Sequence, residues 1–273
     1  MRYLFLLACL LGGCGDDAPA PTQPSSGQSA LDALKTLPKT DAAYINTHLP
    51  GVVLGPSTTT PPLTNADAWL PLKAGTMTFL TPGPHGKKIL NTLHATDREP
   101  GMPVGSKTGG WSLGLPDNSV HYLRQTPGKG IELPTVVSHK EGLITRLNPP
   151  EPLVLEGQAK NTSAVTTIKV RVYDLHEPAV LAHSGELTCT WTDLGGWNVK
   201  VPMGTYDTRL VHMNAKGTIG PADVDVDRYL FLAKGIGVVA FIREHIIAAL
   251  LVYHDDRADV GVLQSIDHAK TSH

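Results

Sequence analysis

The sequence predicts an all-β protein: an antiparallel sandwich, half-barrel or barrel of about a dozen short strands, preceded by a disordered tether. Three observations predict this class. Apolar or alternating runs of strand length recur along the chain. The 27 glycines and 22 prolines are spread between those runs, as turns require. No long stretch has the 3.6-residue period of an amphipathic helix.

The first residues have the pattern of an export signal. Arg2 precedes an apolar run that ends at Leu11, and Gly12 and Gly13 then precede Cys14. A positive start, a short apolar core and small residues before a cut site are typical of a secretory signal peptide. The segment ending at Cys14 resembles the lipobox of bacterial lipoproteins, which implies cleavage after residue 13 and acylation of Cys14. An ordinary signal peptide that contains a cysteine is the alternative.

Acylation of Cys14 would determine where the protein lies. One acyl chain binds a membrane only marginally, whereas two or more form a stable anchor. The resemblance implies a diacylglycerol and usually a third chain on Cys14. Gly15, and not Asp, follows the cysteine, so the usual signal for retention at the inner membrane is missing at that position. We therefore expect the acylated Cys14 to anchor the protein in the outer membrane, with the domain facing the periplasm or the cell surface.

The predicted organisation has five parts. They are a signal peptide (1–13), the lipidated cysteine with a flexible tether (14–40), short helices and a loop (41–64), a β domain (65–255) and a polar C-terminal tail (256–273). Residues 15–28 contain no large apolar residue, so this segment cannot bury enough surface to offset its chain entropy. Within the third part, Asp41 is the predicted N-cap of a helix that ends before Pro50.

The β domain contains a series of predicted strands. The clearest is Val165–Leu175, in which apolar and polar residues alternate as in a half-buried strand. Asn148–Pro152 holds three prolines and is expected to break regular structure. The other predicted strands are 76–80, 88–95, 111–115, 120–125, 131–138, 143–147, 186–193, 197–201, 208–213 and 228–234.

The stretch Tyr229–Tyr253 is the most apolar part of the domain. Gly235, Gly237 and the charged tripeptide Arg243–His245 divide it into three runs of strand length. We predict strand, turn and strand, with a positive φ or a close backbone approach at one or both glycines. The alternative is a helix over Phe241–Tyr253. A transmembrane helix is excluded, because charges interrupt the run before the roughly 18 apolar residues needed.

Four short segments carry a family resemblance. In order, they are Trp69–Gly75, Glu141–Leu143, Val201–Tyr206 and Tyr229–Val238. Together they resemble a loosely defined group of uncharacterised bacterial outer-membrane lipoproteins, over roughly residues 67–253. The signature glycines are Gly204, Gly235 and Gly237.

The resemblance implies a β-rich fold and no catalytic residue, because none is assigned in that group. The chain departs from the pattern at Met77 and Phe79, where an aromatic pair is usual. A curved sheet with an apolar concave face would also be similar to periplasmic lipoprotein carriers, which implies lipid binding.

Charge and cysteine content exclude two classes. The formal net charge is −2, and no basic stripe appears, so we expect no nucleic-acid partner. With Cys9 removed and Cys14 lipidated, Cys189 has no partner for an intramolecular disulfide. Cys189 lies in a predicted strand, where a buried and inert thiol is expected.

Metal and nucleotide motifs are incomplete. Asp223, Asp225 and Asp227 have the spacing that opens a calcium loop, but Arg228 stands in place of the required glycine. At a period of two they share one face of a strand, which favours a solvated acidic edge. Residues 101–108 resemble a phosphate-binding loop without its second glycine, and prolines favour a flexible loop there.

None of the 12 histidines has paired metal spacing, and we expect no cofactor. Histidines from separate strands could still converge on a metal. They are His121, His139, His176, His183 and His212.

Two function classes remain open. The favoured one is a non-enzymatic binding or structural module for a protein partner, an envelope component or an apolar ligand. The alternative is an envelope hydrolase or metal-dependent enzyme with residues that converge from separate strands. A pocket lined by two or more His, Asp or Glu side chains would favour the enzyme. An apolar groove or a flat exposed patch would favour the binding module.

Overall fold

The computed structural model describes residues 34–83, 85–96, 98–100, 110–249 and 253–268. The predicted signal peptide, Cys14 and most of the tether lie outside the described residues. The segment 101–109, with its resemblance to a phosphate-binding loop, also lies outside them.

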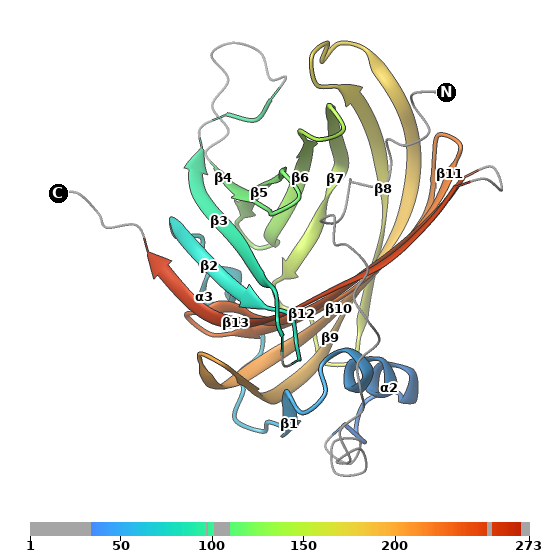
Figure 1. Cartoon of the computed structure of the whole chain (residues 1–273). Coiled ribbons are helices and arrows are strands. Elements are labelled where there is room, and N and C mark those ends of the chain that lie inside the picture. The colour runs from blue at the N-terminus through green and yellow to red at the C-terminus, as the bar shows by residue number, and fades with distance from the viewer. Residues whose placement is uncertain (1–33, 84, 97, 101–109, 250–252, 269–273) are drawn as a thin grey trace.

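The described residues form thirteen strands in one antiparallel sheet (Figure 1). The strands are β1 (Val53–Pro56), β2 (Gly75–Leu80), β3 (Lys88–Thr96), β4 (Gly110–Gly114), β5 (Ser119–Thr126), β6 (Gly130–Ser138), β7 (Leu143–Leu155), β8 (Ser163–Asp174), β9 (Leu181–Val201), β10 (Gly204–Ile219), β11 (Ala222–Ala233), β12 (Gly237–Ala249) and β13 (Tyr253–His268). Their order is β1-β9-β10-β11-β12-β13-β2-β3-β4-β5-β6-β7-β8, and β8 also pairs with β9. The last pairing closes β2 to β13 into a barrel of twelve strands, with β1 added beside β9. The all-β prediction is confirmed, and of its three architectures the barrel is the one formed.

Alternation along the strands separates two apolar cores. In β8, Ile168, Val170 and Val172 are buried while the residues between them are exposed, as predicted for a half-buried strand. These three belong to a core formed mainly by β5 to β11 and by Trp69. A second core lies on the other face of the long strands and includes Ile45.

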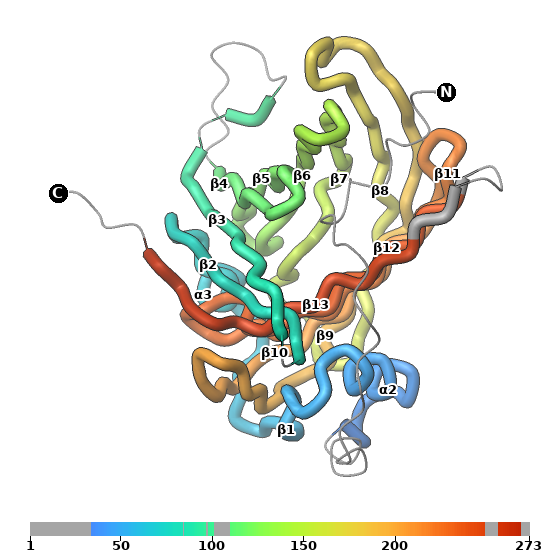
Figure 2. Tube along the Cα trace, viewed as in Figure 1, coloured from blue at the N-terminus to red at the C-terminus, as the bar shows by residue number. Residues whose placement is uncertain are grey.

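Two helices are described, α2 (Lys39–His48) and α3 (Ala66–Trp69). Figure 2 shows α2 and β1 together at one end of the trace, beside the long strands. Asp41 is not the N-cap of α2, which is Pro38; its carboxylate instead accepts a hydrogen bond from the Tyr229 hydroxyl at 2.9 Å. No helix among the described residues has the length and apolar character to cross a membrane.

The last strand corrects the predicted polar tail at 256–273. Tyr253–His268 is strand β13, which pairs with β12 on one side and β2 on the other. Its polar residues obscured a strand pattern, but Val262 and Leu263 are buried. A polar residue can also occupy the inner face of a strand when it binds a partner there. Asp259 does so, because its carboxylate accepts a hydrogen bond from Nη2 of Arg243 at 2.9 Å.

Two irregular strands, β7 and β9, are longer than predicted. β7 continues through Asn148–Pro152, although this run holds three prolines. Its pairing with β6 shifts there: Leu133 faces Glu151, whereas Thr135 faces Arg146, so that the residues between Arg146 and Glu151 have no partner on β6. The predicted strands 186–193 and 197–201 are one strand, β9. The register slips where Arg209 faces Gly196, so that residues 194–195 bulge.

The apolar stretch near the C-terminus forms strand, turn and strand as predicted. Gly235 has φ 78° and Gly237 has φ 102°, which confirms the expected positive φ at both. The tripeptide Arg243–His245 lies inside β12 and not at a turn, and the alternative helix is wrong for residues 241–249.

Candidate functional site: a cavity inside the barrel

The interior of the barrel contains a cavity of about 320 Å³. Its wall is mainly apolar and comes from strands on opposite sides of the ring. Representative residues are Met77, Ile89, Leu93, Leu123, Leu230 and Phe241. The volume falls at the lower end of the roughly 300–1,000 Å³ of small-molecule sites. A mostly apolar site of this size can enclose a small apolar molecule.

The two segments at the ends of the family resemblance meet at this cavity. Residues 70–73, which follow α3, line it together with residues 236–238 of the β11–β12 turn. The Gly235 N–H donates to the Ala68 carbonyl at 2.7 Å and ties the turn to α3. At Gly237, which itself lines the cavity, an added Cβ would lie 3.7 Å from Leu70 and Pro71. Gly204 instead opens β10 and is not among the lining residues.

A row of charged side chains crosses one wall of the cavity. Arg228 of β11 faces Arg243 of β12, which in turn faces Asp259 of β13. Arg228 donates through Nη1 to Glu151 of β7, a strand that is not its neighbour in the sheet, so this ion pair spans the interior. Like charges directly opposite each other destabilise a sheet. The two guanidinium groups therefore need acceptors.

Those acceptors are not all supplied by the described residues. Nε and Nη2 of Arg228, Nε of Arg243 and Nε2 of His121 are buried there without a hydrogen-bond partner. We call Arg228, Arg243 and His121 the arginine patch; all three line the cavity. A buried donor without an acceptor costs about 1–3 kcal/mol, and more when it is charged. The patch is therefore a place where an acceptor binds favourably.

The surroundings of His121 keep it neutral. Burial, followed by the positive charges of Arg243 and Arg228, holds its pKa well below the usual value of 6.5. A neutral imidazole offers one donor and one acceptor nitrogen. His121 can thus add a hydrogen bond next to the two guanidinium groups without a third positive charge.

The cavity lining has an excess of positive charge. Its cationic side chains are Lys73, Lys87, Lys88, Arg228 and Arg243, against Asp259 as the acidic one. In the buried wall, Glu151 and Asp259 balance Arg228 and Arg243, so the excess positive charge lies on the three lysines, which are exposed. Such a field raises the local concentration of anions.

The lining has features of both predicted function classes, the binding module and the enzyme. It is mainly apolar, and it also contains His121, Asp259 and His268. However, Asp259 is ion-paired with Arg243, and Nε2 of His121 has no hydrogen-bonded nucleophile or carboxylate among the described residues. The arrangement suits binding.

The other histidine, acidic and cysteine candidates lie elsewhere. His212 is bonded to Asp227 at 2.5 Å and stacks on Tyr229, so it does not converge with His121. Asp225 pairs with Lys216 at 2.8 Å, which gives the predicted acidic edge cross-strand partners. Within the described part of the chain, no group of three or more His, Cys, Asp or Glu side chains could hold a metal. Cys189 is buried as predicted, and burial raises its pKa to about 12.

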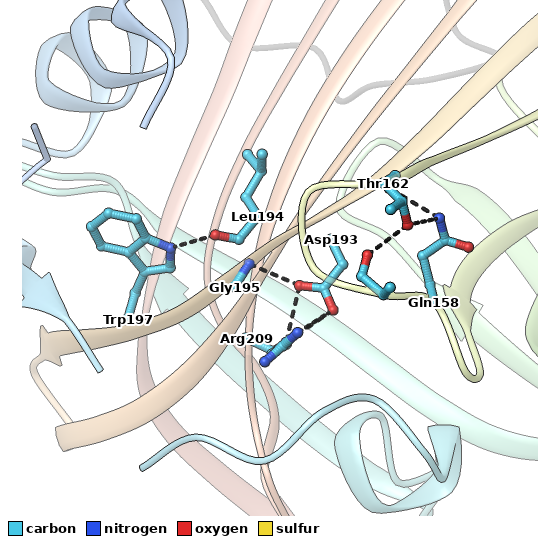
Figure 3. Close-up of polar contacts among 8 residues, drawn as sticks. Gln158, Thr162, Asp193, Leu194, Gly195, Trp197 and Arg209 are labelled. Carbon is cyan, nitrogen blue, oxygen red and sulfur yellow. Dashed lines mark hydrogen bonds and ion pairs between the residues drawn. The ribbon is translucent and has the colours of Figure 1, made fainter. Parts of the chain in front are cut away.

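A second buried arginine, Arg209, is not among the residues that line the cavity; Figure 3 shows its contacts with Asp193. Arg209 donates through Nε at 2.9 Å and through Nη2 at 2.5 Å to the carboxylate of Asp193. The Gly195 N–H, inside the β9 bulge, also donates to Asp193 at 2.8 Å. Arg209 and Asp193 have no buried side-chain nitrogen or oxygen without a partner among the described residues.

The sequence analysis missed Arg228, Glu151 and the role of Arg243. In the sequence, Arg228 only interrupts a calcium-loop pattern, and Arg243 only separates two apolar runs. A signal for both was present: each is a charged residue on a strand face whose other residues are mostly apolar. Such a residue needs a buried partner or a ligand.

Comparison with known proteins gives little further guidance. No family model and no curated protein matches the chain. The structure of the hypothetical lipoprotein YmcC from Escherichia coli (K12) has 10% identity and a TM-score of 0.37, and the match covers 78% of this chain and 98% of that one. A lipoprotein structure from Parabacteroides distasonis ATCC 8503 has 11% identity and a TM-score of 0.33, with 76% and 100% covered. Both TM-scores are low, and no function follows from them.

Proposed function

We propose that this chain is a lipid-anchored envelope protein whose barrel binds an apolar ligand, and that it is not an enzyme. The observation that carries the proposal is the apolar cavity of about 320 Å³ inside the barrel. The alternative, a hydrolase or metal-dependent enzyme, would need a nucleophile–base pair or a ligand cluster in the cavity. Among the described residues, the buried polar groups of the lining are instead the ion pair of Arg243 with Asp259, nitrogens of Arg228, Arg243 and His121 without a partner, and the Oδ1 of Asn91, also without one.

Strand β3 offers a matched pair of substitutions to test the binding site. Ile89 lines the cavity, whereas its neighbour Leu90 is 52% exposed and points away from it. Ile89→Trp should fill the cavity, and Leu90→Trp should leave it unchanged. Because the indole would occupy space that the ligand needs, we expect Ile89→Trp to weaken binding by roughly tenfold or more, about 1.4 kcal/mol.

The measurement is titration with the neutral fluorophore N-phenyl-1-naphthylamine, with circular dichroism to verify folding. The wild-type protein and Leu90→Trp should give the same saturable increase in fluorescence. Absence of binding to the wild type, or equal binding to Ile89→Trp, would contradict the proposal.

The anchor is tested separately at Cys14. Cys14→Ser should release the protein from the outer-membrane fraction and abolish acyl labelling, because a single unmodified chain end provides no hydrophobic anchor. A Cys14→Ser protein that stays with membranes after a high-salt wash would refute the lipoprotein part of the proposal.

A further inference from the structure

We infer that the ligand is amphipathic: a single acyl chain with an anionic head, a carboxylate or a phosphate, which the arginine patch binds. This inference rests on the proposed function and names its ligand class. The two buried arginines, Arg209 and Arg228, differ in what binds the same two nitrogens of the guanidinium group, and this difference supports the inference.

That edge is the pair of donors Nε and Nη2, which lie side by side and match the two oxygens of a carboxylate. In Arg209 the edge holds the carboxylate of Asp193. In Arg228 the corresponding Nε and Nη2 are both buried and have no acceptor among the described residues, while Nη1 donates to Glu151. Since Arg228 lines the cavity, the acceptor that suits this edge is an oxyanion inside the cavity.

The neighbours of Arg228 favour the same head. Arg243, directly opposite on β12, has Nε buried without an acceptor among the described residues, and the buried Nε2 of His121 has no hydrogen-bond partner among them either. An oxyanion placed there would accept from several donors and would reduce the repulsion between the two guanidinium groups. A cationic head would do neither, and an uncharged head could accept a hydrogen bond but would not reduce the repulsion.

The rest of the cavity selects the tail. Its wall is apolar, which suits an acyl chain, and its volume is small, which favours one chain over two. The exposed lysines at residues 73, 87 and 88 attract an anionic head and repel a cationic one. The head contacts the buried arginine patch, and the chain lies along the apolar wall.

The test is displacement of N-phenyl-1-naphthylamine by four ligands with the same ten-carbon chain: decanoate, decyl phosphate, 1-decanol and decyltrimethylammonium. Because charge-assisted hydrogen bonds are worth about 1.5–3 kcal/mol, we expect at least one anion to bind roughly 10- to 150-fold more tightly than decanol. Decyltrimethylammonium should bind most weakly. Tighter binding of decanoate identifies a carboxylate head, and tighter binding of decyl phosphate a phosphate head; either result supports the inference.

The matched variants are Arg228→Lys and Arg209→Lys. Both arginines are 6% exposed, but only Arg228 lines the cavity. Arg228→Lys keeps a cation for Glu151 and removes the Nε–Nη2 edge, so the anion preference over decanol should fall by about tenfold or more. Arg209→Lys should keep the full preference. If Arg228→Lys does not fold, the paired variant Arg228→Met/Glu151→Leu, which removes both buried charges, tests the same point.

The outcomes separate the inference from the proposed function. If neither the fluorophore nor decanol binds, the proposed function fails, and the inference fails with it. If both bind but decanol competes as well as the anions, or if Arg228→Lys keeps the preference, the inference is overturned while the apolar site stands.

Discussion

Arg209 and Arg228 are equally buried, at 6% exposure each, yet their surroundings differ. Asp193 accepts from both donors on the Nε–Nη2 edge of Arg209 and is itself fully buried. Arg228 has one bond to Glu151, and two of its nitrogens have no partner among the described residues. The first arginine lies at a β-bulge, whereas the second lies on the wall of a cavity.

The difference indicates two uses for a buried cation. At Arg209 every buried donor is matched within the chain, so the pair holds β9 and β10 together across an irregular register. At Arg228 two buried donors have no acceptor among the described residues, which lowers the stability of the protein alone and provides affinity for an anion. The comparison predicts that damage to the first pair mainly affects folding and damage to the second mainly affects ligand binding.

The largest effect should follow Asp193→Asn. This change leaves the Arg209 guanidinium buried without its counter-charge, and breaking a buried pair costs about 3–5 kcal/mol. Urea denaturation should show that loss, with unchanged relative affinities for decanoate and decanol in the folded fraction. A loss below about 1 kcal/mol would show that Arg209 reaches water, and would remove the contrast with Arg228.

A smaller effect should follow Glu151→Gln. It also removes the counter-charge of a buried arginine, but Glu151 accepts one hydrogen bond from Arg228, whereas Asp193 accepts from two donors of Arg209. We therefore expect a smaller loss, of about 1–3 kcal/mol in urea. Decanoate should then stabilise Glu151→Gln more than it stabilises the wild type, because the ligand supplies the missing negative charge. A loss equal to that of Asp193→Asn, without extra stabilisation by decanoate, would contradict this view.

The smallest effect is a pH dependence at His121. Its pKa is lowered in the folded protein, so below about pH 6.5 the unfolded state binds the proton more readily, and stability should decrease as the pH falls. His121→Gln should flatten this part of the profile of unfolding free energy against pH. The matched variant is His48→Gln on α2, where burial also lowers the pKa but the cavity is not involved. A profile that His121→Gln leaves unchanged would show that His121 is not held neutral beside the arginines.

Much of the fold follows from local pattern. Strands such as β8 are visible in the sequence because alternate side chains face one core, and Gly235 and Gly237 mark a turn because their φ values disfavour other residues. β13 could not be found this way, because polar residues dilute its apolar pattern. The closure of the ring, through β8 and β9 and through β13 and β2, depends on pairings that no local pattern encodes.

The site was predictable only in part. Residues of the segments 69–75 and 229–238 line the cavity, although the sequence indicated these segments as a signature of the fold and not as a site. The arginine patch was not predictable, because it joins His121 of β5 to Arg228 and Arg243 across the barrel. Which donors find an acceptor depends on side-chain geometry: Asp193 accepts from both Nε and Nη2 of Arg209, whereas Glu151 accepts from Nη1 of Arg228.

The most direct test of the central claim observes the two arginine edges separately. Nitrogen-15 NMR of arginine-labelled protein resolves Nε–H signals, which Arg228→Lys and Arg209→Lys would assign. On addition of decanoate, the Arg228 Nε–H signal should shift and exchange more slowly with water, while the Arg209 signal should stay in place. Decanol should move neither signal in this way. An Arg228 signal that decanoate leaves unchanged, although the ligand displaces the fluorophore, would contradict the account.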